Sequence, residues 1–155
     1  MKNALLITSF SFLLFMSGSC LKDSACKNKS VDSERSAILT YASANGITAT
    51  EHSSGVFYQV ITPGSGATPS TTSTVTVRYI GKRLDGQIFD DHTSTDAVFK
   101  LGDVILGWQK GLPLIQKGGS IKLIIPSSLG YGCTGFGSVP ANTILYFEIS
   151  LINVI

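Results

Sequence analysis

The sequence has 155 residues, of which 14% are charged, and its formal net charge is +2. Removal of residues 1–19 would take away one lysine and no acid, which leaves 11 basic and 10 acidic residues. So small an excess excludes the electrostatic signature of a nucleic-acid-binding protein or of one drawn to an acidic membrane surface. The length suits a leader followed by one domain of about 100 residues with a modest core.

The first twenty residues have the pattern of an export leader. Ala4 to Met16 is apolar but only 13 residues long, which is short for a membrane-spanning helix. The small residues Ser17 to Ser19 and the following Cys20 resemble the lipobox of bacterial lipoproteins. We therefore expect a signal peptide over residues 1–19 and lipidation of Cys20. Ser17 stands where the motif prefers leucine, so the alternative is a simple secretory signal with Cys20 incidental.

Residues 20–54 are expected to be a tether that contains a short helix. Leu21 to Ser30 is polar and lysine-rich without an apolar period, which indicates a flexible segment. A helix is predicted from a cap at Ser30 or Asp32 to Ala44, because Asn45-Gly46 is a stop signal. The helix is too small for a dimerisation domain, so we expect a spacer that packs on the following domain of a monomeric protein.

Residues 55–155 are expected to form one domain of strands around a short helix. The predicted strands are residues 55–61, 74–82, 87–90, 120–125 and 143–154. Residues 104–115 have apolar side chains at helical spacing, which predicts a helix despite Gly107 and Gly111. Several strands and one short helix indicate an α+β fold, an antiparallel sheet wrapped around the helix.

Aromatic residues flank the predicted helix, which contains Trp108, the only tryptophan. The apolar face of the helix alone would predict nothing more than a core helix. The flanking residues, however, could line an apolar pocket with Trp108 as its floor. They are Tyr79, Phe89 and Phe99 before the helix and Tyr131, Phe136 and Phe147 after it.

Other kinds of site have little support. The two histidines, His52 and His92, lie in unrelated contexts, and no nucleophile–histidine set is visible. Three consecutive side chains, Asp90-Asp91-His92, cannot all face one metal ion from a strand. The glycine-rich segment Gly130 to Gly137 lacks the phosphate-loop pattern. We expect neither a metal nor a cofactor.

Several motifs in register then point to a family. The run F-K-L-G-D-V-I-L-G-W-Q-K-G-L, Phe99 to Leu112, resembles the core signature of the FKBP-type peptidyl-prolyl isomerases, the rapamycin-binding immunophilins. V-R-Y-I-G and L-D-G-Q-I-F-D precede it, and I-P-S-S-L-G-Y-G and V-P-A-N-T-I-L-Y-F-E-I-S-L follow it. The resemblance covers residues 55–155. It implies a twisted antiparallel half-barrel of five or six strands around one short helix.

The resemblance also implies a proline pocket and roles for its residues. The catalytic set would be Tyr79, Phe89, Asp90 and Tyr131, and the substrate-binding set Phe99, Val104, Ile105, Trp108, Val139 and Phe147. The backbone N–H of Ile105 and the hydroxyl of Tyr131 would hold substrate carbonyls. Asp90 would meet the twisting amide or order Tyr79. The alternative for each residue is plain packing or, for Asp90, a turn carboxylate.

The implied function is isomerisation of prolyl peptide bonds during the folding of exported proteins. The expected partners are proline-containing polypeptides, rapamycin-type macrolides and, through the lipid anchor, the membrane of the bacterial cell envelope, with the outer membrane favoured. Two alternatives stay open. One is a non-catalytic chaperone or assembly partner that uses the same pocket, and the other is a structural lipoprotein of an envelope machine.

Two features depart from the pattern of the family. Ala97 replaces a second aromatic residue two positions before Phe99, which widens one wall, and Cys133 occupies a usually small position. An oxidising envelope would allow Cys133 to pair with Cys26 on the tether. Two free thiols are the default expectation, with the disulfide as the alternative.

Overall fold

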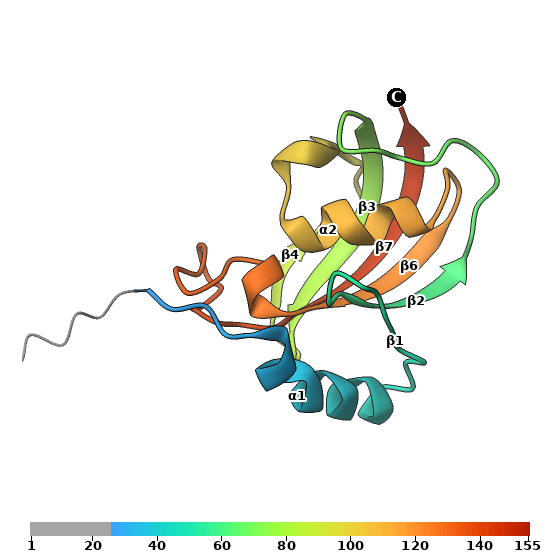
Figure 1. Cartoon of the computed structure of the whole chain (residues 1–155). Coiled ribbons are helices and arrows are strands. Elements are labelled where there is room, and N and C mark those ends of the chain that lie inside the picture. The colour runs from blue at the N-terminus through green and yellow to red at the C-terminus, as the bar shows by residue number, and fades with distance from the viewer. Residues whose placement is uncertain (1–25) are drawn as a thin grey trace, which may run out of the picture.

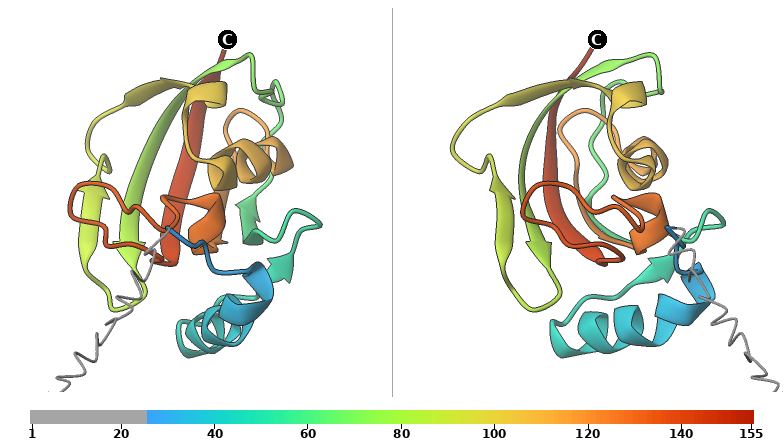
Figure 2. Two further views of the ribbon diagram at one scale, coloured as in Figure 1. Left: turned by 60° about the vertical axis from the view of Figure 1, so that its left-hand side comes forward. Right: turned by 90° about the vertical axis from the view of Figure 1, so that its left-hand side faces the viewer.

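A seven-stranded antiparallel sheet organises residues 26–155, the part of the chain that the computed structural model describes. Its strands are β1 (Thr50–Glu51), β2 (Phe57–Thr62), β3 (Thr74–Arg83), β4 (Ile88–Asp91), β5 (Ala97–Lys100), β6 (Ser120–Ile125) and β7 (Leu145–Val154). They lie in the order β1-β2-β6-β7-β3-β4, and β5 also pairs with β3 (Figure 1). The sheet curves around helix α2 (Leu106–Gly111) without closing, which confirms the predicted α+β half-barrel (Figure 2).

Alternation along the strands creates the main core between the sheet and α2. Val75, Val77 and Tyr79 of β3 point to this side and are buried, as their period of two predicts. In the adjacent strand β7, Leu151 pairs with Val77 and Ile149 with Tyr79, so the apolar side chains of both strands share one face. This face becomes the wall against which α2 packs.

Two glycines allow α2 to lie close to the sheet. The helix has only six residues and continues at its C-terminal end into the 3-10 turn Leu112–Leu114, so the regular helix is shorter than the predicted 104–115. A second 3-10 turn, Leu101–Asp103, precedes it, separated by the extended residues Val104 and Ile105. A Cβ atom on Gly107 would lie 2.4 Å from Ile125, and one on Gly111 would lie 2.6 Å from Leu123. So short a helix depends on tertiary packing. The glycines, unfavourable for an isolated helix, are what that packing requires.

Helix α1 (Val31–Ala44) packs against one end of the opposite face of the sheet (Figures 1 and 2). Its Ile38 and Ala42 are buried in a second cluster with Phe57, Ile124 and Tyr146, which alternate in their strands with residues of the main core. The predicted spacer is therefore a packed layer of the domain.

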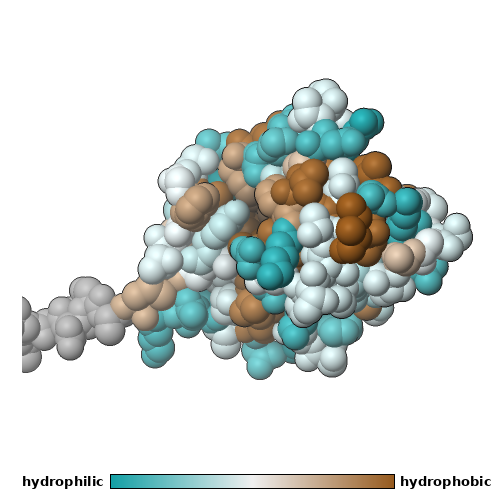
Figure 3. All heavy atoms as spheres, turned by 90° about the horizontal axis from the view of Figure 1, so that it is seen from above, coloured by the Kyte–Doolittle hydropathy of each residue, from teal (hydrophilic) through white to brown (hydrophobic). Residues whose placement is uncertain are grey.

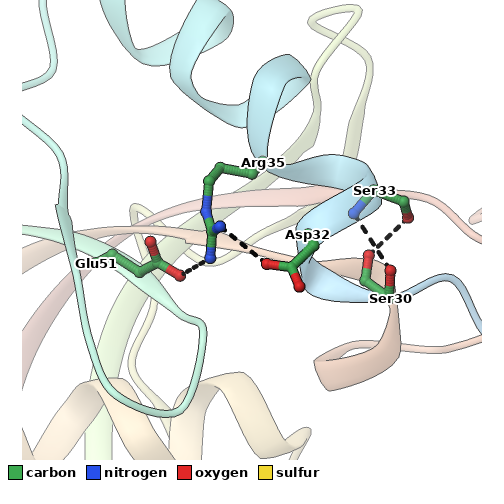
Figure 4. Close-up of polar contacts among 5 residues, drawn as sticks. All are labelled: Ser30, Asp32, Ser33, Arg35 and Glu51. Carbon is green, nitrogen blue, oxygen red and sulfur yellow. Dashed lines mark hydrogen bonds and ion pairs between the residues drawn. The ribbon is translucent and has the colours of Figure 1, made fainter.

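Polar contacts fix the beginning of α1 (Figure 4). Ser30, one of the two predicted caps, accepts a hydrogen bond from the N–H of Ser33 at 3.3 Å. Arg35 forms ion pairs with Asp32 at 2.8 Å and with Glu51 of β1 at 2.6 Å, which join the helix to the sheet edge.

Three features differ from the sequence-based expectations. The short strands β1 and β5 were not predicted, so the sheet has seven strands rather than five or six. Cys26 and Cys133 form a disulfide, with Cα atoms 5.4 Å apart, instead of remaining free thiols. Residues 26–30, expected to belong to a flexible tether, lie against the loop between β6 and β7. The pairing depends on where this segment lies in space, which composition does not reveal.

The predicted leader, residues 1–19, and Cys20 lie outside the described residues. Within residues 26–155, no helix is both long enough and apolar enough to cross a bilayer.

Candidate functional site

A cavity of about 390 Å³ opens between α2, the curved sheet and the loop that links β6 to β7. It is lined by Tyr79, Asp90, Phe99, Asp103, Val104, Ile105, Trp108, Tyr131, Phe136 and Phe147. Eight of the ten side chains predicted for the pocket are among them. Residues far apart in the sequence thus meet at one place because the sheet wraps around α2.

Trp108 forms the floor of the cavity. It projects from α2 and is only 4% exposed. Its ring meets the rings of Tyr79, Phe147 and Phe99 nearly edge-on, with centroids 4.9, 5.3 and 5.9 Å away. Its indole N–H is buried and has no acceptor among residues 26–155. Aromatic packing on several sides therefore holds the ring, while the remaining side borders the cavity.

Asp90 and Tyr79 form the main polar contact in the cavity wall. The two residues lie on neighbouring strands, and the hydroxyl of Tyr79 donates to Asp90 Oδ2 at 2.5 Å. Burial, followed by this hydrogen bond, raises the pKa of the Tyr79 phenol well above its ordinary value. The tyrosine stays protonated at neutral pH and gives Asp90 a fixed orientation.

His92 belongs to the same group, although the sequence analysis did not assign it to the site. Its ring stacks on Tyr79 with a centroid separation of 5.2 Å, and its Nε2 lies 3.6 Å from Asp90 Oδ1. The available signal was the period of two, which places Asp90 and His92 on one side of their segment. Within the described residues, no group of three or more His, Cys, Asp or Glu side chains gathers as a metal site.

Phe89 and Val139, both predicted for the pocket, do not line the cavity directly. The Phe89 ring packs edge-on against Phe147 at 5.5 Å and faces Tyr131 at 6.5 Å. Gly81 permits this packing, since a Cβ atom there would lie 2.8 Å from both phenylalanine rings. Val139 belongs to the loop that links β6 to β7; its side chain is buried in the main core and its backbone pairs with Phe136.

Phe136, one of the flanking aromatic residues expected near the pocket, and Asp103, which was not expected there, also line the cavity. Phe136 is 70% exposed and stacks on Tyr131 with centroids 5.2 Å apart, so it extends the apolar surface beyond the mouth of the cavity. Asp103, in the turn before α2, adds a second carboxylate beside Asp90. No lysine or arginine is among the lining residues. Figure 3, the molecule seen from above, shows further hydrophobic surface gathered between polar patches.

Besides the indole N–H of Trp108, two further hydrogen-bond donors at the cavity have no partner within residues 26–155. One is the backbone N–H of Ile105, at the start of α2, and the other is the hydroxyl of Tyr131. The side chain of Gln109 donates to the carbonyls of Val104, at 2.8 Å, and Gly102, at 3.2 Å, and so holds the turn that presents Ile105. Burial and then the charge of Asp90 raise the pKa of Tyr131, which keeps its hydroxyl a donor. The site therefore offers an apolar volume in which the N–H of Ile105 and the hydroxyl of Tyr131 remain available to a ligand.

Two other hollows have a different character. One, of about 300 Å³, lies between α1 and the β3–β4 hairpin and is lined by Lys29, Glu34, Arg83 and Asp85 among others. The other, of about 480 Å³, lies on the outer side of the sheet beside Arg78, Lys122 and Glu148. Both carry charges of both signs, so the aromatic cavity remains the candidate site.

Comparison with known proteins agrees with this choice. Residues 66–152 match the family model of the FKBP-type peptidyl-prolyl cis-trans isomerases. The chain is similar to the isomerase FkpA of Escherichia coli, with 43% identity over 104 residues, which is 66% of this chain and 38% of that protein. The FkpA of Aeromonas hydrophila is 42% identical over 113 residues, or 72% of this chain and 41% of that protein. The chain thus spans about two fifths of the length of these curated relatives.

Solved structures show the same similarity. The crystal structure of Escherichia coli FkpA superposes with a TM-score of 0.72 at 36% identity, covering 79% of this chain and 59% of that one. A peptidyl-prolyl cis-trans isomerase of Pseudomonas syringae superposes with a TM-score of 0.68 at 33% identity, covering 83% of this chain and 98% of that one.

Proposed function

Since the chain belongs to the family of FKBP-type peptidyl-prolyl cis-trans isomerases, we propose that it isomerises prolyl peptide bonds in the cavity around Trp108. The observation that carries this proposal is the combination of a cavity lined mainly by aromatic and aliphatic side chains with the unpartnered donors of Ile105 and Tyr131. This combination suits a reaction that needs no proton transfer and no metal.

The physical basis lies in amide resonance. Rotation about a peptide bond meets a barrier of about 18–20 kcal/mol, and uncatalysed prolyl isomerisation takes about 10–100 s. The planar amide has a larger dipole than the twisted one, so water stabilises the ground state more. An apolar cavity removes that preference and favours the twisted form. Each 1.36 kcal/mol of this difference corresponds to about a tenfold change in rate.

The polar groups would orient the substrate rather than react with it. The N–H of Ile105 and the hydroxyl of Tyr131 would hold carbonyls on either side of the proline, whose ring would rest on Trp108. Asp90 already accepts a hydrogen bond from Tyr79, so we assign it the ordering of that wall and electrostatic contact with the twisting amide. Phe89 would support the cavity from behind, through Phe147 and Tyr131.

A protease-coupled assay with proline-containing tetrapeptides tests this function. We expect isomerisation faster than the blank, with saturation by substrate. A chain that binds unfolded polypeptides or rapamycin but does not accelerate isomerisation would instead be a binding module. A single stoichiometric partner in a pull-down, without acceleration, would indicate a structural lipoprotein.

We also propose that rapamycin-type macrolides occupy the cavity, which a binding titration would test. We propose further that the protein is monomeric, which analytical ultracentrifugation would test.

We further propose that the protein acts in the bacterial envelope, anchored by a lipid on Cys20 after removal of residues 1–19, with the outer membrane favoured. The support is the order of a short apolar stretch, small residues and a cysteine. Acyl chains contribute about 0.8 kcal/mol per buried CH2 group, so several chains give stable anchoring. Metabolic labelling with palmitate should mark the unmodified protein and not the Cys20→Ser variant, which should be released from membranes. Label in the variant would refute the assignment.

A further inference from the structure

The loop that carries Tyr131 has little regular secondary structure, and its internal hydrogen bonds join residues of the loop to one another rather than to the sheet. Residues 126–144, which we call the Tyr131 loop, contain one 3-10 turn and one isolated bridge between Phe136 and Val139. Gly132, Gly135 and Gly137 have positive φ angles. Glycines in such conformations leave an unsupported loop with high conformational entropy. The position of the Tyr131 hydroxyl therefore depends on what holds this loop.

The segment before α1 holds the outer part of the loop. Cys26 is joined to Cys133 by the disulfide, and the N–H of Cys133 donates to Asn28 Oδ1 at 2.8 Å. Asn142 donates from its side chain to the carbonyl of Lys27 and accepts from the N–H of Lys29, both at 3.4 Å. We call residues 26–29 the brace. It meets the loop on both sides of Phe136.

The loop is shaped to receive the brace. At Gly132, a Cβ atom would lie 2.7 Å from Asn28 Oδ1, so any other residue would push the Asn28 side chain away. Asn142 is the only non-glycine residue with a positive φ among residues 26–155, and its own N–H donates to the carbonyl of Gly132 at 2.7 Å. Gly132 and Asn142, the two loop residues that lie against the brace, thus both adopt backbone conformations with a positive φ.

Helix α1 holds the beginning of the same loop. Glu34 is 3% exposed, and its Oε2 accepts a hydrogen bond from the N–H of Ser127 at 2.8 Å. Such a charge-assisted bond in a buried place is stronger than a neutral one. The N-terminal region therefore contacts the loop before and after Tyr131, which lies two residues from Cys133.

We propose that Cys26 and Asn28 are positioning residues of the isomerase site, which act by fixing Tyr131 where its hydroxyl meets the substrate. The inference rests on the proposed function. In this assignment residues 26–29 support the site through Tyr131 without touching the substrate, whereas a segment that only anchors the chain could be removed without effect on the reaction.

The test compares variants of the full chain in the tetrapeptide assay. Cys26→Ser/Cys133→Ser and Asn28→Ala should lower kcat/KM by about threefold to tenfold, mainly through KM, because they loosen a binding group and leave the apolar floor intact. Asn28→Asp keeps an oxygen acceptor in the same place and should stay near the unmodified value. Arg35→Gln, which breaks ion pairs of α1 away from the loop, is the matched control and should change nothing.

A double-mutant cycle separates positioning from general stabilisation. With Tyr131→Phe as background, the brace variants should lose most of their effect, because the hydroxyl that they position is gone. Full additivity in that background, or unchanged kcat/KM in both brace variants, would overturn the proposal. If the double serine variant does not fold, the comparison of Asn28→Ala with Asn28→Asp still tests the proposal.

Hydrogen exchange distinguishes failure of this inference from failure of the proposed function. The amides of Gly132 and Cys133, which donate to the carbonyl of Ser127 and to Asn28 Oδ1, should exchange faster in both brace variants than in the unmodified and Arg35→Gln proteins. If the unmodified protein shows no isomerase activity, the proposed function is wrong, and the exchange data then judge the brace. Unchanged protection of these amides would overturn it.

Discussion

Replacement of Gly107 by alanine tests the close packing of α2 on the sheet. In an exposed helix, alanine would be favoured over glycine by about 1 kcal/mol. Here the new Cβ atom would lie 2.4 Å from Cγ2 of Ile125, which is fully buried and cannot retreat into solvent. An overlap of this size belongs at the upper end of overpacking costs, about 3 kcal/mol. We therefore expect Gly107→Ala to lower the free energy of unfolding by about 2 kcal/mol.

Urea unfolding monitored by circular dichroism would measure this change. Ile125→Ala removes all three atoms nearest to the new Cβ, so the double variant should be more stable than the two single changes predict, by about 1 kcal/mol or more. Leu106→Ala on the exposed side of the same helix is the control and should change stability by no more than about 0.5 kcal/mol. A Gly107→Ala protein as stable as the original would refute the packing argument.

Two further predictions concern the cavity, and a third concerns the ionisation of buried tyrosines. Asp90→Leu should lower kcat/KM by about tenfold and stability by only about 1 kcal/mol, since Tyr79 loses its acceptor but no core is removed; unchanged activity would take Asp90 out of the site. Trp108→Leu should remain folded with a modest loss of activity, and a saturating pocket ligand should change the tryptophan fluorescence of the original protein. If the variant unfolds and the ligand leaves the emission unchanged, Trp108 is a core residue and not the floor of the pocket. In the fold, burial and neighbouring carboxylates raise the pKa values of Tyr79, Tyr131 and Tyr146, so these phenols stay protonated while the unfolded chain ionises. The free energy of unfolding should therefore fall as pH rises above about 10, less steeply in Tyr79→Phe, and a pH-independent value between pH 9 and 11 by urea titration would contradict this.

Strands and helices whose apolar residues recur at a regular spacing were predicted correctly from the sequence. The alternation of Val75, Val77 and Tyr79 predicted the buried face of β3, because successive side chains of a strand point to opposite faces of its sheet. The helical spacing around Trp108 likewise predicted α2. Strand β5 was missed because Ala97–Lys100 is short and its pairing with β3 is non-local. The seventh strand, β1, has two residues and no period to detect.

The pocket was predicted less completely than the fold. The resemblance brought together the residues that surround Trp108, yet Phe89 and Val139 support the wall from behind while Asp103 and Phe136 line it. Whether a side chain faces the cavity or backs the wall depends on rotamers and on the course of an irregular loop. Neither has a sequence period.

The disulfide between Cys26 and Cys133 depends on tertiary packing that the local sequence does not reveal. Cys26 lies in a polar segment that composition assigns to a tether, and Cys133 lies in a glycine-rich loop; 107 positions separate them. What brings them together is α1, whose Ile38 and Ala42 pack on the outer side of the sheet. Because of this packing, the segment before α1 lies against the connection between β6 and β7. Glu34 of α1 holds the beginning of that connection by accepting a hydrogen bond from the N–H of Ser127. Once α1 is treated as a layer of the domain, the segment before it must pass the Tyr131 loop. A tether that only carried a membrane anchor would not need an asparagine and a cysteine matched to that loop.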